Sequence, residues 1–199
     1  MSNSQIEKDP MREEILNGAR ILFERFGFKK TTMEDIAKQI GKSKSALYYY
    51  YKTKEDIFEA VVLHDIDTQQ AVAVKAVEEE ASAPGKFRVL FTTLLKDVTE
   101  KATRFSFFRS DITENPFLLT NIIKRRDSVI EEQIKDILIV GISRHEVRMM
   151  NNAEISLWSK MVNLTMRGLG TKMFLEDEHF SESQLEFLAD TLFKGVMVA

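Results

Sequence analysis

Hydrophobic residues recur along most of this sequence with the period of an α-helix. Those of residues 12–26 share one stripe of a helix with 3.6 residues per turn. They are Ile15, Ala19, Leu22, Phe23 and Phe26. Gly27 follows and is expected to end that helix as a C-terminal cap. Strict alternation of apolar and polar residues is nowhere sustained, so the pattern predicts an all-α protein with about nine helices.

Two short helices are expected next. Thr32 and Asp35 have the spacing of a capping box, and the helix that they begin ends after about eight residues at Gly41. Ser43 then caps a third helix over about residues 44–51. Helices this short are not stable alone, so both must pack against the longer helix that precedes them.

A much longer helix is predicted from Thr53, its N-cap, to about Glu80, and the clearest break in the chain follows at residues 82–85. Helical patterns continue beyond the break. They cover residues 86–103, 105–112, 117–145, 152–175 and 181–197. We therefore expect an N-terminal domain over 1–60 and a C-terminal helical domain over 61–199.

The two short helices and their glycine-containing turn have the form of a helix-turn-helix motif, over about residues 33–52. Leu47 and Tyr51 lie one turn apart and are expected to point into the core. The N-terminal end of the second helix, which would enter a major groove, then exposes Lys44, Ser45, Tyr48 and Tyr49.

These residue types suit contact with DNA. Lys44 can donate to guanine O6 and N7 or to a phosphate, and Ser45 can bond a base edge or the backbone. Ala46 or the ring of Tyr49 can press on a thymine methyl group, while Tyr48 and Tyr50 suit phosphates. Thr32 and Lys54 stand at helix N-termini, which attract anions and would set the register on the duplex. With Lys42, the predicted DNA-contacting set is Thr32, Lys42, Lys44, Ser45, Ala46, Tyr48, Tyr49, Tyr50 and Lys54.

The charge distribution supports this interpretation. The chain has a net charge of −3, which would argue against nucleic acid if it were evenly spread. Residues 25–54 hold eight Lys or Arg against two acidic residues, and the rest of the chain holds 20 basic and 29 acidic side chains. A local basic patch on an acidic body is typical of a DNA-binding protein.

Other classes of function find no support in the sequence. There are no cysteines, and His64, His145 and His179 lie far apart without metal-ligand spacing, so no metal or cofactor is expected. Paired-carboxylate motifs and phosphate-binding glycine loops are missing, so an all-helical enzyme is the weaker alternative. The N-terminus lacks a signal-peptide pattern, and the longest apolar stretch, 137–142, is far below the ~18 residues of a membrane span. We expect a cytoplasmic protein without a membrane partner.

Residues 31–37 and 41–55, together with Phe26-Gly27 and Ile57-Phe58, resemble the signature of the tetracycline-repressor (TetR) family. The close resemblance covers about residues 12–60. Lys42 departs from the family, which often carries a small apolar residue there; the lysine could reach a phosphate instead. The resemblance implies a dimeric transcriptional regulator, most often a repressor that a small molecule releases from DNA. A family member that binds DNA without an effector remains the alternative, and the four tyrosines could also be simple packing.

The resemblance further implies that the C-terminal domain binds a ligand, which we expect to be partly apolar. The predicted lining residues are Phe87, Phe91, Phe105, Phe108, Phe117, Arg125, Trp158, Met161, Asn163 and Met166. Most large apolar residues of such a domain are ordinary core. Polar residues that could orient a ligand are Arg109, Asn121, Arg125, Asn163 and Arg167.

The last two predicted helices are the expected dimer seam, because apolar residues recur along each at helical spacing. They are Trp158, Met161, Val162, Thr165, Leu169 and Met173, then Leu185, Leu188, Leu192 and Val196. The alternative is that these stripes face their own core. A two-fold dimer would present two motifs, so the operator should be an inverted repeat. The sequence does not identify the operator or the effector, and it does not distinguish repression from activation.

Overall fold

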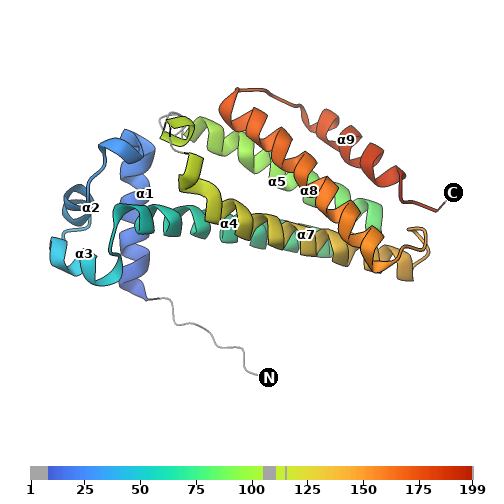
Figure 1. The fold of residues 1–199 in the computed structure, drawn as a ribbon, viewed down its shortest axis with the longest axis horizontal. Helices are drawn as coiled ribbons and strands as arrows, with labels where there is room; N and C mark the ends of the chain where they lie inside the picture. The colour runs from blue at the N-terminus through green and yellow to red at the C-terminus, as the bar shows by residue number, and fades with distance from the viewer. Residues whose placement is uncertain (1–8, 105–110, 115, 199) are drawn as a thin grey trace, which may run out of the picture. The chain divides into compact units, whose positions relative to one another are not determined.

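The computed structural model of the chain describes residues 9–104, 111–114 and 116–198. The elements with defined bounds are eight α-helices and one short 3₁₀ helix (Figure 1), and residues 111–114 are helical as well, which confirms the all-helical prediction. They are α1 (Pro10–Lys30), α2 (Met33–Gln39), α3 (Lys44–Tyr50), α4 (Lys54–Glu79), α5 (Ala83–Arg104), η1 (Pro116–Leu119), α7 (Thr120–Ser143), α8 (Asn152–Leu175) and α9 (Glu182–Lys194). None of the described helices combines the length and the apolarity of a membrane span.

The chain folds as two compact units. The head contains the chain up to Asp65 together with residues of the 105–120 segment, and the body contains residues 66–104 and 121–199. The long helix α4 begins in the head and ends in the body. The predicted division of the chain between residues 60 and 61 stays a prediction. A single boundary in the sequence could not have assigned residues 111–114 to the head.

The first helix runs past the residue that was expected to end it. Asp9 caps α1 by accepting a hydrogen bond from the Met11 N–H at 3.0 Å. Gly27 adopts φ 80° and ψ 171°, and the helix kinks there instead of ending. The kink changes which side of the helix faces inward. Phe28 is therefore buried, and Phe26, predicted on the apolar stripe, is 44% exposed.

A small aromatic and aliphatic core holds the head together. Phe58 of α4 packs edge-on against Phe23 and Phe28 of α1, with ring centroids 5.6 and 5.2 Å apart. Polar contacts add to this packing, because Arg20 of α1 forms an ion pair with Asp65 at 2.7 Å and lies 3.1 Å from Nδ1 of His64. Both helices of the motif add a fully buried residue to the head, namely Ile36 of α2 and Leu47 of α3.

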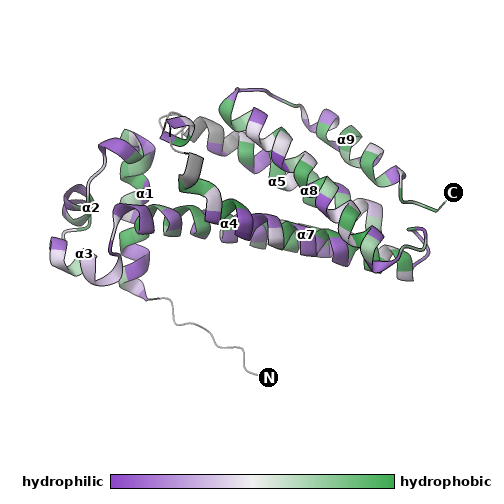
Figure 2. Cartoon of the chain, in the orientation of Figure 1, coloured by the Kyte–Doolittle hydropathy of each residue, from purple (hydrophilic) through white to green (hydrophobic). Residues whose placement is uncertain are grey.

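In the body, α5 packs against α8 and α9. Hydrophobic and hydrophilic positions are interspersed along these helices, as Figure 2 shows. The rings of Phe87, Trp158 and Phe193 form a triangle with centroids 5.1 to 5.9 Å apart, which joins one residue of each of these helices. The α7 helix adds fully buried isoleucines, Ile130 and Ile134, to the same core.

Candidate nucleic-acid interface

The head presents a helix-turn-helix whose ends are determined by local hydrogen bonds. Thr32 Oγ1 accepts from the Asp35 N–H at 3.1 Å, and Asp35 Oδ2 accepts from the Thr32 N–H at 2.9 Å, so the predicted capping box of α2 is present. Hydrogen bonds from the Thr32 side chain and backbone hold the pKa of Asp35 below its ordinary value of 3.8. Gly41 takes φ 64° in the turn, and Ser43 caps α3 through the Ala46 N–H at 3.2 Å.

The turn is pressed closely against α1. A Cβ added to Gly18 would lie 2.3 Å from Cγ2 of Ile40, the residue that ends α2. Only a glycine in α1 allows this approach, and the approach sets the position of the turn that leads into α3. The role of Gly18 was not predicted, because its neighbour Ile40 lies 22 residues away in the sequence.

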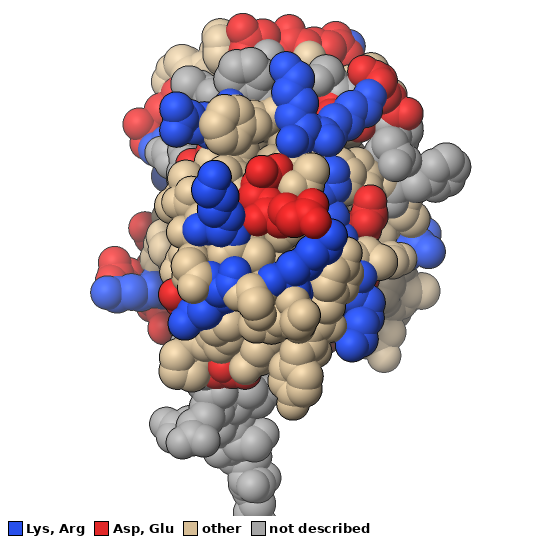
Figure 3. Space-filling view, turned by 90° about the vertical axis from the view of Figure 1, so that its left-hand side faces the viewer, with Lys and Arg blue, Asp and Glu red and all other residues tan. Residues whose placement is uncertain are grey.

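The orientation of α3 agrees with its sequence pattern. Leu47 is fully buried and Tyr51 is buried at its end, so the opposite side of the helix faces outward. Lys44 and Ser45 are exposed there, and the ring of Tyr49 is 78% exposed. Figure 3 shows the side of the molecule where α2 and α3 lie, with Lys and Arg side chains around a small acidic group. This is a surface with cations at its edges and an exposed aromatic ring.

Lys44 is held in place at the start of α3. Its ammonium forms an ion pair with Glu34 of α2 and lies 5.9 Å from the centroid of the Tyr48 ring. The hydrogen bond to Glu34 raises the pKa of Lys44, so the lysine is fully charged at neutral pH. Both groups are exposed, and an exposed ion pair can be exchanged for a DNA contact at little cost.

The neighbouring tyrosines differ from one another. Tyr48 is exposed, whereas Tyr50 is half-buried and stacks edge-on with Tyr49 at a centroid separation of 5.1 Å. The guanidinium of Arg12 lies 5.7 Å from the Tyr50 ring and 5.5 Å from the Tyr51 ring. Burial, and then the charge of Asp9, raise the pKa of Tyr50, so its hydroxyl keeps its proton. Sequence reasoning missed Arg12, since nothing local connects it to α3.

Other predicted contacts lie around this surface. Lys42 is exposed and is 3.5 Å from a Glu14 carboxylate oxygen, and Thr32 is exposed at the start of α2. Ala46 is partly buried on α3. Lys52 donates to the carbonyl oxygen of Tyr48 at 3.0 Å and thereby closes the C-terminal end of α3.

Lys54, whose phosphate contact stays a prediction, has partners within the head. Its ammonium donates to the carbonyl oxygen of Phe28 at 2.7 Å and lies 4.2 Å from the centroid of the Phe28 ring. Burial lowers the pKa of Lys54. The side chain therefore binds the end of α1, because the last carbonyls of a helix lack an intrahelical partner.

Asp111 is a second anchor of the same region. It is only 4% exposed, and its Oδ2 accepts hydrogen bonds from the N–H of Phe28 at 2.7 Å and of Lys29 at 3.4 Å. Glu114, from the same segment, forms an ion pair with the Lys29 side chain. Residues more than 80 positions apart thus meet at the end of α1, and no local signal in the sequence could have paired them.

The predicted pocket residues of the body lie in different environments. Phe87, Phe91 and Met166 are buried in its hydrophobic core, and Trp158 packs against that core. Asn163 is 2% exposed and donates to Glu131 Oε1 at 3.2 Å. Phe105 and Phe108 lie outside the described residues, as does the Phe117 side chain. Which of these residues touch a ligand stays a prediction.

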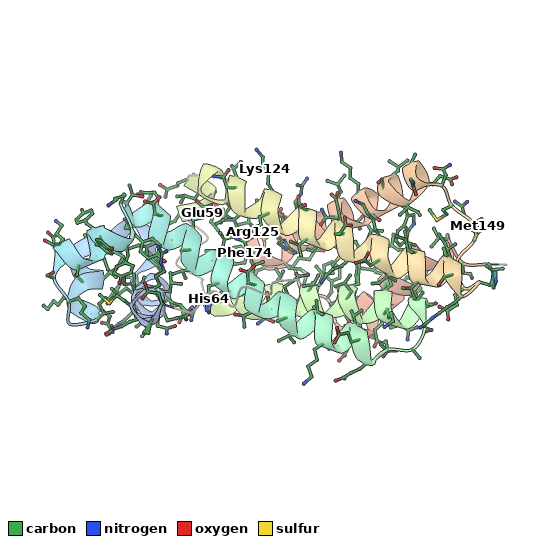
Figure 4. All side chains as sticks on the ribbon, turned by 90° about the horizontal axis from the view of Figure 1, so that it is seen from below. Glu59, His64, Lys124, Arg125, Met149 and Phe174 are labelled. Atoms are coloured by element: carbon green, nitrogen blue, oxygen red, sulfur yellow. The ribbon has the colours of Figure 1, made fainter. Side chains whose placement is uncertain are left out.

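Two of the predicted pocket residues face outward instead. Arg125, labelled in Figure 4 beside Lys124, is exposed and pairs with Asp67 of α4 at 3.1 Å. Met161 is 57% exposed on α8. Met161 was predicted from an apolar stripe and Arg125 as a polar residue that could orient a ligand. Successive residues of a helix are turned by about 100°, so the sequence alone does not say which of them face inward.

The predicted dimer seam is also divided between core and surface. Val162, Met173, Leu185 and Val196 are buried in the core of their own chain, as the alternative interpretation had it. Of the predicted seam, Met161 faces outward, with 57% of its surface exposed. The other large apolar side chains that face outward on these two helices are Leu157, Leu164 and Leu175 on α8 and Phe187 on α9, with 61%, 42%, 36% and 68% of their surface exposed.

Known proteins match both the motif and the fold. Residues 15–61 match the model for bacterial regulatory proteins of the tetR family. The regulator UidR of Escherichia coli is 38% identical over 65 residues, a third of each chain. The negative regulator IcaR of the biofilm operon icaADBC in Staphylococcus epidermidis is 28% identical over 65% of this chain and 68% of its own. The structure of FadR from Bacillus subtilis in complex with stearoyl-CoA is similar over 92% of this chain and 95% of its own, with TM-score 0.64 and 19% identity.

The sequence matches concentrate on the head, and the structural match extends the likeness of fold to the body. The family is one of DNA-binding transcriptional regulators and not of enzymes. A capped helix-turn-helix with an exposed basic and aromatic face is what such proteins require of their N-terminal helices. The chain belongs to the tetR family of bacterial regulatory proteins.

Proposed function

We propose that the protein is a homodimeric, ligand-responsive repressor that binds an inverted-repeat operator. In this proposal residues 1–60 form the DNA-binding domain, residues 61–199 bind the effector and form the dimer, and the protein acts in the cytoplasm. The observation that carries the proposal is α3, a helix with one buried side and with Lys44, Ser45 and Tyr49 exposed on the other.

The contacts with DNA divide into two groups. Lys44 and Ser45 at the start of α3, with the exposed ring of Tyr49, are proposed to read base edges in the major groove. Thr32 and Lys42 lie around them and are proposed to contact phosphates, which set the register and carry no sequence information. Lys54 is left out of both groups, because its ammonium already binds the end of α1.

The outward apolar residues of α8 and α9 support a dimer. Leu157, Met161 and Leu164 are spaced by four and three residues, so they share one side of α8. Large apolar side chains on one exposed side of a helix are typical of a surface that another protein covers. A second copy covering it would place two heads for an inverted repeat.

The effector control rests on the continuity of α4. This helix carries Phe58 of the head core near its start and Ala73 of the body core further on. A ligand that binds one arrangement of the body more tightly than another would shift α4, and the heads would leave the spacing that DNA requires. The name of IcaR, a negative regulator, supports repression. The structure of FadR in complex with stearoyl-CoA supports control by a ligand.

The proposal is tested by selecting operators from random DNA with the full chain and measuring affinity by fluorescence anisotropy. We expect inverted repeats, and a loss of about 5- to 150-fold in affinity for Lys44→Ala, equivalent to roughly 1–3 kcal/mol. Lys160→Ala, an exposed lysine of α8, is the control. Unchanged binding by Lys44→Ala, or the recovery of no preferred sequence, would show that α3 is not the recognition helix.

The dimer is tested separately by light scattering. Met161→Asp should give monomers at micromolar concentration, because it places a charge in a surface that loses its contact with water when the dimer forms. Ile139→Asp, a 54% exposed position on α7, should leave the dimer intact. Monomeric wild-type protein would remove this part of the proposal.

A further inference from the structure

The body contains charged side chains among its helices as well as hydrophobic ones. Asp97 and Lys101 of α5 form an ion pair at 2.7 Å, with only 13% and 22% of their side chains exposed. Asp127 of α7 and Arg167 of α8 form another at 2.7 Å, in which the Asp127 side chain is 16% exposed. The Arg167 side chain is 41% exposed, so these ion pairs are partly removed from water. An unmatched charge in such surroundings is costly.

Arg126 is the charge in this group without a match. It stands on the inward stripe of α7, one turn after Ile122 and one turn before Ile130, which are 2% and 0% exposed. Arg125, its neighbour, points outward to Asp67. A guanidinium thus occupies a position at which the helix otherwise carries isoleucine.

No hydrogen bond or ion pair of Arg126 is found within the part of the chain that the structure describes. Burial lowers the pKa of Arg126, the carboxylates of Asp127 and Asp97 raise it, and Arg167 lowers it. Those two carboxylates already pair with Arg167 and Lys101. Among the described residues this group therefore has three cations for two carboxylates, although Oδ1 of Asp127 is itself buried without a hydrogen bond.

An arginine cannot relieve this imbalance by losing its proton at physiological pH. Its planar guanidinium offers five N–H donors in an arrangement that matches the oxygens of a carboxylate or a phosphate. The matching partner is thus an anion that the described residues do not supply. Leu94 and Leu95, less than one turn before Asp97 on α5, belong to the hydrophobic core, so the surroundings of this group are apolar.

We propose that Arg126 binds the anionic group of the effector, a carboxylate or a phosphate on a molecule whose remainder is apolar. The inference rests on the proposed ligand-responsive function and narrows the class of effector. It also replaces Arg125 by the adjacent arginine as the polar anchor of the ligand site.

The test uses three probes with the same ten-carbon chain: decanoate, decyl phosphate and 1-decanol. Binding to the full chain is followed by the fluorescence of Trp158, the only tryptophan, and by isothermal titration. We expect the wild type to bind one or both anions at least about 10-fold more tightly than the alcohol. The two anionic probes distinguish a carboxylate effector from a phosphate effector.

The matched variants are Arg126→Met and Arg125→Met. Arg126→Met should lose the preference for the anion and, without ligand, should have a Tm no lower than that of the wild type, because it removes an unpaired charge. Arg125→Met should keep the preference. Equal binding of the alcohol, no binding of either anion, or a preference retained by Arg126→Met would overturn the assignment. A fall in the Tm of unliganded Arg126→Met would do so too, because the charge would then already be paired within the protein.

Operator binding is measured on the same samples without any probe. If wild type and Arg126→Met both bind the operator but the ligand results contradict the assignment, the failure concerns Arg126 and not the DNA-binding function. If neither binds any operator, it is the proposed function that fails.

Discussion

Replacing Asp111 by alanine should destabilise the head although the residue lies far from the DNA-binding motif in the sequence. Its carboxylate accepts a 2.7 Å hydrogen bond from the Phe28 N–H, and both residues are buried, with 4% and 7% of their surface exposed. Alanine would leave that N–H without a partner and without water. A hydrogen bond to a charged group contributes about 1.5–3 kcal/mol, so we expect a loss of about 2 kcal/mol in the free energy of unfolding of the head.

The assay is urea unfolding followed with two reporters. All four tyrosines lie in the head, at residues 48–51, and the single tryptophan, Trp158, lies in the body. Asp111→Ala should lower the midpoint seen by tyrosine emission more than the midpoint seen by tryptophan. Separate midpoints would also show that the two units do not unfold as one.

Glu114→Ala is the matched control from the same segment. Glu114 pairs with Lys29 on the surface, where 61% and 53% of their side chains are exposed. Such exposed pairs contribute about 0–1 kcal/mol. If Asp111→Ala stayed within about 0.5 kcal/mol of the wild type, or lost no more than Glu114→Ala, the buried hydrogen bond to Phe28 could not be what holds this segment to the head.

Three further predictions follow from the head. Gly18→Ala should lower the Tm and weaken operator binding, because overpacking against Ile40 costs about 1–3 kcal/mol and exceeds the gain of about 1 kcal/mol in helix propensity. A rise in the Tm of this variant would contradict the close approach. Lys54→Met should cost about 1 kcal/mol of stability and leave the salt dependence of operator binding unchanged. If the slope of log K against log salt concentration became smaller by about one unit, Lys54 would contact a phosphate after all. Thr32→Ala should raise the pKa of Asp35 toward 3.8 in an NMR titration. Because that pKa is depressed in the folded protein, Asp35 stabilises the head above its unfolded pKa, and the contribution is lost as the pH falls through the folded value; an unchanged pKa in the variant would refute the capping role of Thr32.

Much of the head could be predicted from the sequence, because the interactions that define it are local. The capping box joins Thr32 to Asp35, and Ser43 caps α3 through Ala46, each over three residues. Glycine in the turn and a buried Leu47 follow from the same short-range rules. The exposed side of α3, and with it the candidate DNA-binding residues, could therefore be identified from the sequence alone.

The body was predicted less completely, because a helical stripe indicates an amphipathic helix without saying what covers each side. Val162 and Leu185 face their own core, whereas Met161 and Phe187 do not. A wide apolar stripe spans both the core side and the outward side of such a helix. Only the packing of α8 and α9 on α5 separates the two.

The partners of several charged residues follow only from the tertiary structure. Lys54 binds the carbonyl of Phe28, 26 residues away, and Asp111 binds the N–H of the same residue across 83 positions. Arg125 and Arg126 are chemically identical neighbours, yet one pairs with Asp67 at the surface and the other lies on the inward stripe of α7. The helices, their caps and the exposed side of α3 could be predicted from the sequence, because those depend on residues three or four positions apart. The partner of a charge depends on which distant segments the fold brings within about 4 Å, and a single sequence contains no local record of that distance.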